Sequence, residues 1–347
     1  MKDVVVTRLF RSLIPAVVLA TAAGCGVAVL AGTLVAPHLE GAAPPVACLA
    51  ADERPPAPGA GMVLIPGGRF KMGSEDFRAE EAPLRKVTVD PFWIDSHDVT
   101  NAQFARFVAE TGYVTVSERT PPLTGDSQAM APDRHANVAG AWVFVQPAEI
   151  RNLEDIGQWW KFVPGANWRH PEGPGSDLSG RQNHPVVQVA FEDAEAYAVW
   201  AGRRLPTEEQ WEFAARGGRD QVDPGNAEQD SDAAPRSNHW RGIFPILNFG
   251  SKGYKRTSPV GCFPANAYGL YDIVGNVWQW TRSSWTPDHQ PGPTSPDEVS
   301  YVIKGGSFLC APNFCMRYRP AARQPGDGTV AAQHIGFRTV LPNPPSQ

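Results

Sequence analysis

The sequence lacks the short motifs that mark the most familiar metal, redox and nucleotide sites. It contains no CxxC pair, no HExxH and no Walker loop, so the usual zinc, thiol-redox and phosphate-loop chemistries have no motif to rest on. Its five cysteines are too few and too scattered for a disulfide framework. A large charge excess is absent as well: 31 basic and 36 acidic residues give a net charge of -5, which indicates no nucleic-acid partner.

Glycine and proline are abundant instead, with 33 and 34 of the 347 residues. Long helices and central strands exclude these residues from their interiors, which argues against a helical bundle or a regular parallel-sheet enzyme. Hydrophobic residues make up 42% of the chain, with 11 Trp and 16 Phe, so enough apolar surface is present to form a core. The composition therefore predicts one large, loop-rich globular domain.

The N-terminal region carries a targeting signal. Residues 13–37 contain no charged side chain and follow Lys2, Arg8 and Arg11. At a rise of about 1.5 Å per residue the stretch can cross a hydrocarbon core of roughly 30 Å, and it is longer than the apolar part of a typical secretory signal. We expect 1–37 to be an uncleaved signal anchor, with a cleaved signal peptide as the alternative. The preceding basic residues favour a membrane-anchored or exported, extracytoplasmic domain, either periplasmic or extracellular.

Two further features concern this N-terminal region. Cys25 follows an Ala-Ala-Gly run that resembles a lipoprotein processing site, although a small apolar residue within a membrane helix is the favoured interpretation. Residues 38–61 are rich in Pro, Ala and Gly, which is typical of a tether. The folded catalytic domain is therefore expected to cover 62–347.

Three short helices are predicted from their end signals. Thr100 and Gln103 form a capping-box pattern that opens a helix ending before Gly112. A second helix is expected at about 192–201, and a third opens at another capping-box pattern at 207–210. The remaining C-terminal part is expected to hold mainly turns and brief strands.

Cys310 and Cys315 lie five positions apart in a segment without a helical pattern. Two thiolates at this spacing can meet at one soft metal ion, and copper(I) accepts so few ligands whereas zinc wants four. A simple disulfide is the favoured structural interpretation in an exported protein, and a pair of buried, unconnected thiols is a third one. Spacing alone leaves these interpretations open.

The sequence around this pair resembles the formylglycine-generating enzymes. The resemblance rests on GGSFLCAPNFCMRYRPAAR at 305–323 and HIGFR at 334–338. It continues in the family order over about 62–340, at MVLIPGG (62–68), GANWRHPEGP (165–174), NHPV (183–186), WAGRRLPTEEQWEFAARGG (200–218) and YGLYDIVGNVWQW (268–280). Fragments such as LPTEEQWE occur across a wider superfamily, whereas the paired cysteines within GGSxxCxxxxC are much more specific.

The resemblance implies both a fold and an activity. The fold would be α+β, irregular and loop-rich, of the C-type-lectin-like kind. The activity would be an oxygen-dependent oxidation, in which a cysteine of an unfolded or nascent sulfatase, in a Cys-x-Pro/Ala-x-Arg context, becomes Cα-formylglycine. In that family two cysteines bind one copper(I) as a bis-thiolate, and this maps onto Cys310 and Cys315. Copper(I) and molecular oxygen are therefore the expected cofactor and co-substrate.

Four further positions match the family's pocket. Trp278 and Ser307 correspond to residues that line the pocket near the metal, and we count them with the catalytic residues. From the residues alone, a core aromatic and a turn hydroxyl explain them as well. Glu118 and His334 fall where the family has groove-lining polar residues, which implies a role in substrate binding.

The resemblance also implies two calcium sites made from loop oxygens. The first would use Asn238, His239 and Tyr254, but Lys252 stands where the family typically offers a carboxylate. Its ammonium is expected to take the place of the ion and bond the same oxygens. The second site would use the side chains of two residues and the backbone oxygens of two more, namely Asp272, Gln279, Gly275 and Val277.

Disulfides that staple this fold in animal relatives are absent, because the corresponding positions hold Ala198, Pro320 and Thr339. None of the three cysteines outside the 310–315 pair is expected to have a disulfide partner.

Two alternatives to a copper oxidase were weighed. The first is a noncatalytic protein- or glycan-binding module on the same fold, which loss of either cysteine of the pair would favour. The second is a related iron-dependent enzyme that forms carbon–sulfur bonds, but such enzymes use three histidines and usually an additional helical domain. The chain has neither that domain nor an HxxxH pattern.

Overall fold

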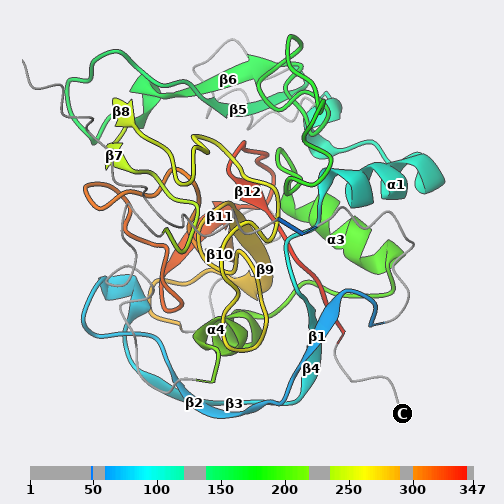
Figure 1. The fold of residues 1–347 in the computed structure, drawn as a ribbon, viewed down its shortest axis with the longest axis vertical. Coiled ribbons are helices and arrows are strands. Elements are labelled where there is room, and N and C mark those ends of the chain that lie inside the picture. The colour runs from blue at the N-terminus through cyan, green and yellow to red at the C-terminus, as the bar shows by residue number, and fades with distance from the viewer. Residues whose placement is uncertain (1–47, 50–58, 121–137, 219–234, 290–299, 342–347) are drawn as a thin grey trace, which may run out of the picture. The chain divides into compact units, whose positions relative to one another are not determined.

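The computed structural model describes residues 48–49, 59–120, 138–218, 235–289 and 300–341 (Figure 1). The predicted signal anchor at 1–37 and most of the predicted tether lie outside these ranges. No helix within the described ranges is long and apolar enough to span a membrane.

Within the described ranges the strands are short and form two larger sheets and three two-stranded hairpins. One sheet has the order β11-β10-β9-β12, with β12 parallel to β9 and the other pairs antiparallel: β9 (Trp278–Ser284), β10 (Ser300–Lys304), β11 (Arg323–Asp327) and β12 (Ile335–Gly336). The other is antiparallel, with the order β1-β4-β13: β1 (Met62–Ile65), β4 (Phe92–Asp95) and β13 (Val340–Leu341). The hairpins pair β2 (Gly68–Met72) with β3 (Arg85–Val89), β5 (Gly140–Phe144) with β6 (Trp160–Pro164), and β7 (Gly242–Ile243) with β8 (Leu247–Asn248).

The three predicted helices are confirmed as α1 (Asn101–Thr111), α3 (Phe191–Trp200) and α4 (Glu208–Arg216). At the start of α1, the Thr100 hydroxyl accepts a hydrogen bond from the Gln103 amide, and the Gln103 side chain accepts one from the Thr100 amide. Gly112 ends the helix in the left-handed conformation, with φ of 67°. The described residues also include three 3₁₀ turns: η1 (Ala79–Glu81), η2 (Val116–Glu118) and η3 (Ile156–Gln158). The predicted α+β, loop-rich architecture is therefore confirmed.

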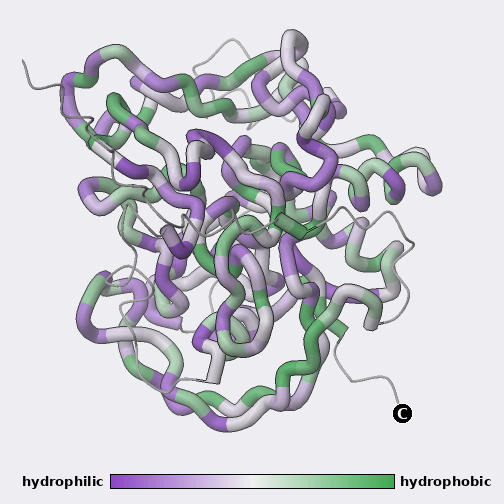
Figure 2. The backbone as a smooth tube through the Cα atoms, in the orientation of Figure 1, coloured by the Kyte–Doolittle hydropathy of each residue, from purple (hydrophilic) through white to green (hydrophobic). Residues whose placement is uncertain are grey.

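The core gathers side chains from many loops around the four-stranded sheet. In Figure 1 this sheet lies centrally, with α4 beside it. Phe104 of α1 stacks on Tyr197 of α3 at a ring-centroid distance of 6.0 Å, which joins these two helices. Figure 2 shows hydrophobic and hydrophilic residues interleaved along the chain. A core of this kind depends on tertiary packing more than on long periodic elements.

Buried ion pairs join α4 to β10 and β11. Lys304 donates to Glu212 at 3.0 Å, and both side chains are fully buried. Arg323 donates to both carboxylate oxygens of Glu208, at 2.8 and 3.1 Å. Burial alone raises the pKa of Glu212, but the nearby Lys304 and Arg216 outweigh burial and hold that pKa below its usual value. Charged side chains therefore occupy buried positions beside the four-stranded sheet, where apolar side chains usually pack.

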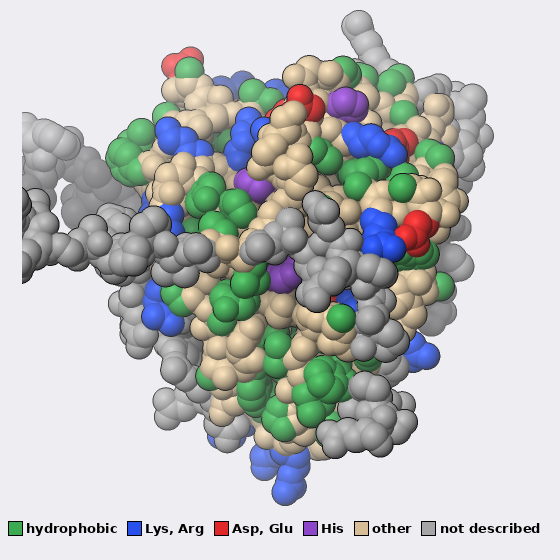
Figure 3. Space-filling view, turned by 45° about the vertical axis from the view of Figure 1, so that its right-hand side comes forward, with side chains coloured by type: hydrophobic (Ala, Val, Ile, Leu, Met, Phe, Trp, Pro, Cys, Tyr) green, Lys and Arg blue, Asp and Glu red, His purple; other side chains and the backbone are tan. Residues whose placement is uncertain are grey.

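Charged side chains are mixed on the surface. Figure 3 shows Lys and Arg as small separate groups among hydrophobic and other side chains on the face drawn. This agrees with the balanced composition. On the face drawn, Lys and Arg form no continuous basic surface of the kind that binds nucleic acid.

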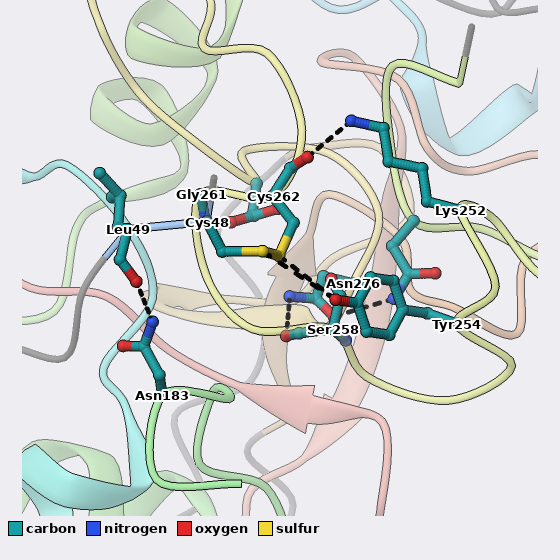
Figure 4. The surroundings of a disulfide bond; sticks show 11 residues. Cys48, Leu49, Asn183, Lys252, Tyr254, Ser258, Gly261, Cys262 and Asn276 are labelled. Atoms are coloured by element: carbon teal, nitrogen blue, oxygen red, sulfur yellow. Dashed lines mark hydrogen bonds between the residues drawn. A yellow bond between two sulfur atoms is a disulfide. The ribbon is translucent and has the colours of Figure 1, made fainter. Parts of the chain in front are cut away.

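Cys48 and Cys262 form a disulfide, so the expectation that neither has a partner is wrong (Figure 4). The Leu49 amide also donates to the Val260 carbonyl at 3.2 Å, and Asn183 donates to the Leu49 carbonyl. The folded part of the chain therefore includes residues 48–49, inside the stretch predicted as a tether. The two cysteines are 214 residues apart in the sequence, so no local pattern indicates that they pair.

We expect replacement of Cys48 by serine to lower the free energy of unfolding by about 2–4 kcal/mol, since a cross-link that closes a long loop restricts the unfolded chain. Chemical denaturation of the full-length chain measures this. Cys25→Ser is the matched control and should leave the midpoint unchanged. Equal stability of Cys48→Ser and the wild type would show that the bond is absent or contributes nothing.

Candidate active site

Residues 305–318 form a closed loop after β10 that carries both cysteines of the pair. Gly305 and Gly306 adopt φ of 95° and 71°, which side-chain-bearing residues rarely do. A Cβ on Gly306 would lie 2.9 Å from the backbone of Arg317, so the two ends of the loop touch at this glycine. The Gly-Gly pair therefore makes the loop possible and brings its arms together.

The turn between the cysteines places their sulfurs next to each other. The Ala311 and Phe314 backbones exchange hydrogen bonds at 2.8 and 3.0 Å, and Cys315 takes a positive φ of 76°. The Cα atoms of Cys310 and Cys315 are 5.1 Å apart, and the structure joins the two sulfurs as a disulfide. Of the interpretations left open by the spacing, the structure thus contains the disulfide. Reduction would release two neighbouring thiols.

The donor set suits a soft ion of low coordination number. Two thiolates in contact can hold copper(I), whereas a four-coordinate zinc site needs further ligands. No group of three or more His, Cys, Asp or Glu side chains suited to a metal occurs among the described residues. Once reduced, Cys310 and Cys315 therefore fit copper(I) better than zinc.

An aromatic cluster supports the loop from one side. It contains Phe144, Trp159, Trp240, Phe244, Phe308, Leu309 and Ala311, all buried. The Trp240 amide donates to the Cys310 carbonyl at 2.9 Å, which ties the first cysteine to this cluster. Cys310 itself is only 2% exposed. The cluster fixes the backbone of Cys310 and keeps water from it.

Trp278 and Ser307 lie on different elements, β9 and the cysteine loop. Trp278 is buried in β9 and shares the main hydrophobic cluster with Cys310 and Cys315. The Ser307 hydroxyl accepts a hydrogen bond from the Leu309 amide at 3.2 Å, and the Ser307 carbonyl accepts one from the Cys310 amide at 2.9 Å. Ser307 therefore shapes the turn that carries Cys310.

His334 adjoins Trp278 through the backbone, because its carbonyl accepts a hydrogen bond from the Trp278 amide at 2.8 Å. Its imidazole packs on Trp160 with ring centroids 4.7 Å apart. The buried Nδ1 atom has no hydrogen-bond partner. Burial lowers the pKa of His334 to about 3, so the imidazole is neutral at physiological pH and has a polar atom to offer a ligand.

Glu118 lies elsewhere, at the end of η2. One carboxylate oxygen accepts hydrogen bonds from the Thr115 amide and hydroxyl at 3.0 and 2.7 Å, and the other forms an ion pair with Arg169. Arg169 also stacks over Trp168 at 4.2 Å from its ring centroid. These residues line a surface hollow of about 510 Å³ together with Tyr113. The structure thus assigns Glu118 to this hollow rather than to the cysteine loop.

A family model for the sulfatase-modifying factor enzyme 1-like domain matches residues 49–342. The chain belongs to this family. The formylglycine-generating enzyme of Mycobacterium tuberculosis is 48% identical over 296 residues, which cover 80% of this chain and 97% of that protein. The solved structure of PvdO from Pseudomonas aeruginosa covers 86% of this chain and 99% of its own, with a TM-score of 0.54 and 23% identity, and so supports the fold alone.

The family also contains proteins named as inactive. The mouse (Mus musculus) inactive C-alpha-formylglycine-generating enzyme 2 is 40% identical over 80% of this chain and 84% of its own length. Overall identity at this level therefore does not separate active from inactive members. An argument for activity must come from the cysteine loop itself.

The three arginines of the family motif have structural partners. Arg317 pairs with Glu80 at 2.6 Å, Arg319 pairs with Glu81, and Arg323 binds Glu208. These ion pairs account for all three arginines.

Two residues that sequence inspection missed also position the site. Arg78 donates to the Cys315 carbonyl at 2.8 Å across 237 residues of sequence. Asn276 accepts hydrogen bonds from Asn238 and the Ser258 amide, and its carbonyl accepts one from the Phe308 amide at 3.0 Å. The Gly-Asn pair before Trp278 was a local signal for Asn276, whereas nothing in the sequence linked Arg78 to Cys315.

The first predicted calcium site is only partly satisfied by hydrogen bonds within the chain. The His239 and Tyr254 carbonyls accept hydrogen bonds from the hydroxyl and amide of Ser251, each at 3.0 Å. The Lys252 ammonium donates at 2.8 Å to the Cys262 carbonyl instead of bonding the expected oxygens (Figure 4). Asn238 Oδ1 is buried and has no partner. The Lys252 ammonium therefore does not take the place of the ion as expected, and the Asn238 side-chain oxygen keeps no partner within the described residues.

The second predicted calcium site retains an available carboxylate oxygen. Asp272 Oδ2 accepts the Gly261 amide at 2.6 Å, whereas Asp272 Oδ1 is buried without a partner. The Gln279 side-chain oxygen is already occupied, since Trp211 and Arg338 donate to it at 2.6 and 2.8 Å. Asp272 therefore fits a cation, while Gln279 serves as a hydrogen-bonded support.

Proposed function

We propose that this chain oxidises a cysteine of an unfolded or nascent sulfatase to Cα-formylglycine, with copper(I) and molecular oxygen. The proposal is supported most by one observation: the family's paired cysteines, Cys310 and Cys315, are both present, and a closed loop brings their sulfurs together. The target cysteine is expected in a Cys-x-Pro/Ala-x-Arg context, as the resemblance implies.

The residues of the chain would prepare the site as follows. When reduced, Cys310 and Cys315 would hold copper(I), which supplies a soft site for the substrate thiolate and electrons for oxygen. The Arg78 guanidinium holds the backbone of Cys315 in place through its hydrogen bond to the Cys315 carbonyl. The buried aromatic cluster excludes water, and the neutral His334 Nδ1 is available to hydrogen-bond the peptide.

The overall reaction sets requirements on the assay. A thiol-bearing CH₂ group becomes an aldehyde, its sulfur leaves as sulfide, and one O₂ supplies the aldehyde oxygen and one water. The balance needs two electrons and two protons, which an external thiol reductant can provide. The same reductant would open the disulfide between Cys310 and Cys315.

A peptide assay tests the proposal. The full-length, reduced chain is loaded with copper(I) and incubated in air with a Cys-x-Pro-x-Arg peptide, and mass spectrometry detects the aldehyde. A matched peptide with Ser in place of Cys should give no aldehyde. A matched peptide with Ala in place of Arg should react more slowly. Tight peptide binding without any aldehyde would instead support the noncatalytic binding module.

We also propose one structural calcium ion, held by Asp272 with the Gly275 and Val277 backbone oxygens. Calcium should raise the thermal midpoint of the wild type, and EDTA should reverse the change, because a ligand that binds only the folded state stabilises it. Asp272→Ala should abolish this calcium response, while Asp177→Ala, at an exposed loop carboxylate, should retain it. A calcium response that survives in Asp272→Ala would place the ion elsewhere.

An extracytoplasmic location is part of the proposal. The uncharged stretch at 13–37 supports membrane anchoring or export. The Cys48–Cys262 disulfide adds support, because such bonds persist mainly in oxidising compartments.

A further inference from the structure

The β7–β8 hairpin exposes four large apolar side chains. Ile243 and Phe249 are 60% and 67% exposed, and Ile246 and Leu247 are 38% and 43% exposed. We call these four residues the apolar hairpin surface. Ile243 and Leu247 are direct cross-strand partners, and no charged residue occurs from 242 to 250. A cluster of exposed apolar side chains on one short element is typical of a binding surface.

The hairpin backbone is firmly held, so these side chains do not collapse onto the domain. The Phe249 amide donates to the Arg241 carbonyl at 2.7 Å, and the Trp240 indole donates to the Leu247 carbonyl at 2.8 Å. Asn248 accepts from the Gly250 amide at 2.9 Å. The surface is therefore preorganised, which reduces the entropy lost when a partner binds.

The hairpin is continuous with the cysteine loop. Asn313, which lies between Cys310 and Cys315, exchanges two hydrogen bonds with the Phe244 backbone, at 3.2 and 3.1 Å. The Phe244 and Phe314 rings stack with centroids 4.3 Å apart and an interplanar angle of 7°. The hairpin therefore adjoins the loop that a target cysteine has to reach.

We propose that the apolar hairpin surface docks apolar segments that flank the target cysteine in an unfolded polypeptide substrate. This inference rests on the proposed function and extends it to the region around the reactive cysteine. An unfolded chain exposes Leu, Val and Phe side chains that a folded protein buries, and these match a surface without charge. Docking of such segments would favour unfolded over folded acceptors.

A binding experiment tests this without requiring turnover. Two fluorescein-labelled peptides share a Ser-x-Pro-x-Arg core, in which serine replaces the reactive cysteine; one has Leu/Val/Phe flanks and the other Ser/Gln flanks. Fluorescence anisotropy gives their Kd for the full-length wild type and for the double variant Ile243→Ser/Phe249→Ser. Val199→Ser on α3 is the matched control, since Val199 is 70% exposed. Unchanged thermal midpoints establish that both variants are folded.

The double variant should bind the apolar-flanked peptide about ten-fold more weakly, because part of two apolar contacts is lost. Its Kd for the polar-flanked peptide, and both Kd values of Val199→Ser, should not change. Equal affinity of the wild type and the double variant for the apolar-flanked peptide would overturn the inference. So would a wild-type dimer that dissociates in the double variant while peptide affinity is unchanged, since the surface would then serve a second copy. Absence of aldehyde formation from a cysteine-core peptide would count against the proposed function alone.

Discussion

Replacing Cys310 or Cys315 with serine is expected to lower the rate of aldehyde formation by at least about 1,000-fold, which corresponds to roughly 4 kcal/mol of activation free energy. A serine hydroxyl is not a soft ligand, so one substitution leaves a single thiolate at the site. Both sulfurs lie in one turn and would hold one ion under the proposal, so the double variant Cys310→Ser/Cys315→Ser should be no slower than either single variant. Initial rates with a Cys-x-Pro-x-Arg peptide give this comparison.

The matched control removes the other disulfide. Cys48→Ser breaks the bond to Cys262, which holds the N-terminal segment and lies outside the 305–318 loop. Its activity per folded molecule should remain near that of the wild type, although its stability should fall. If Cys310→Ser kept more than half of the wild-type rate, the pair would not be the reaction site.

Replacing Lys304 with methionine is expected to destabilise the fold by about 3–5 kcal/mol, because it leaves the buried Glu212 with fewer partners. Lys304 is fully buried, donates to Glu212 at 3.0 Å and also lies 3.6 Å from Glu208. Stabilities of whole domains are about 5–15 kcal/mol, so the loss would be a large fraction of the total. Urea denaturation measures it directly.

The pH dependence of the same variant gives a second readout. Lys304 helps to hold the pKa of Glu212 below its usual value, so the wild type keeps this stabilisation above the usual carboxylate pKa and loses it as the pH falls through the lowered value. In Lys304→Met that pKa should rise, and the loss should begin at a higher pH. Lys71→Met, at an exposed position of β2, should change neither the midpoint nor the acid limb. If Lys304→Met and Lys71→Met changed the denaturation midpoint and its pH dependence equally, the buried Lys304–Glu212 pair would have no specific role in stability.

Sequence inspection predicted the features that depend on near neighbours. The capping boxes at Thr100 and Thr207 bond within three residues, and both open helices as expected. The 310–315 spacing left a disulfide, a metal pair and unconnected thiols open, and the short turn between the cysteines forms the disulfide that the spacing favoured. In each of these cases a few adjacent residues determine the geometry.

Long-range contacts account for what sequence inspection missed. Cys48 is separated from Cys262 by 214 residues and lies in a stretch whose composition is typical of a tether. Arg78 reaches Cys315 across 237 residues of sequence, beside the ion pair of Glu80 in η1 with Arg317 of the cysteine loop, and neither segment carries a pattern that identifies the other. Lys252 was expected to bond the oxygens of the first calcium site, but its side chain reaches the Cys262 carbonyl in another loop. A sequence pattern states what a residue can bond, whereas the fold decides which partner lies within reach.

The hydroxyl of Ser307 illustrates a third case, in which two interpretations coincide. The family resemblance placed it near the metal, and its local pattern suggested a turn. The Ser307 hydroxyl accepts the turn hydrogen bond from the Leu309 amide, and Ser307 itself lies three residues before Cys310 in the same loop. A role in shaping the turn and a place beside the cysteines are therefore compatible.

The most direct test of the central proposal is aldehyde formation by the reduced, full-length chain from a Cys-x-Pro-x-Arg peptide, followed by mass spectrometry with and without copper(I), in air and under argon. The proposal predicts aldehyde only when copper(I) and oxygen are both present, at a rate at least about 1,000-fold lower for Cys310→Ser or Cys315→Ser. Two results would contradict it. One is aldehyde formed at the wild-type rate by Cys310→Ser/Cys315→Ser, and the other is no aldehyde from the copper-loaded wild type in air.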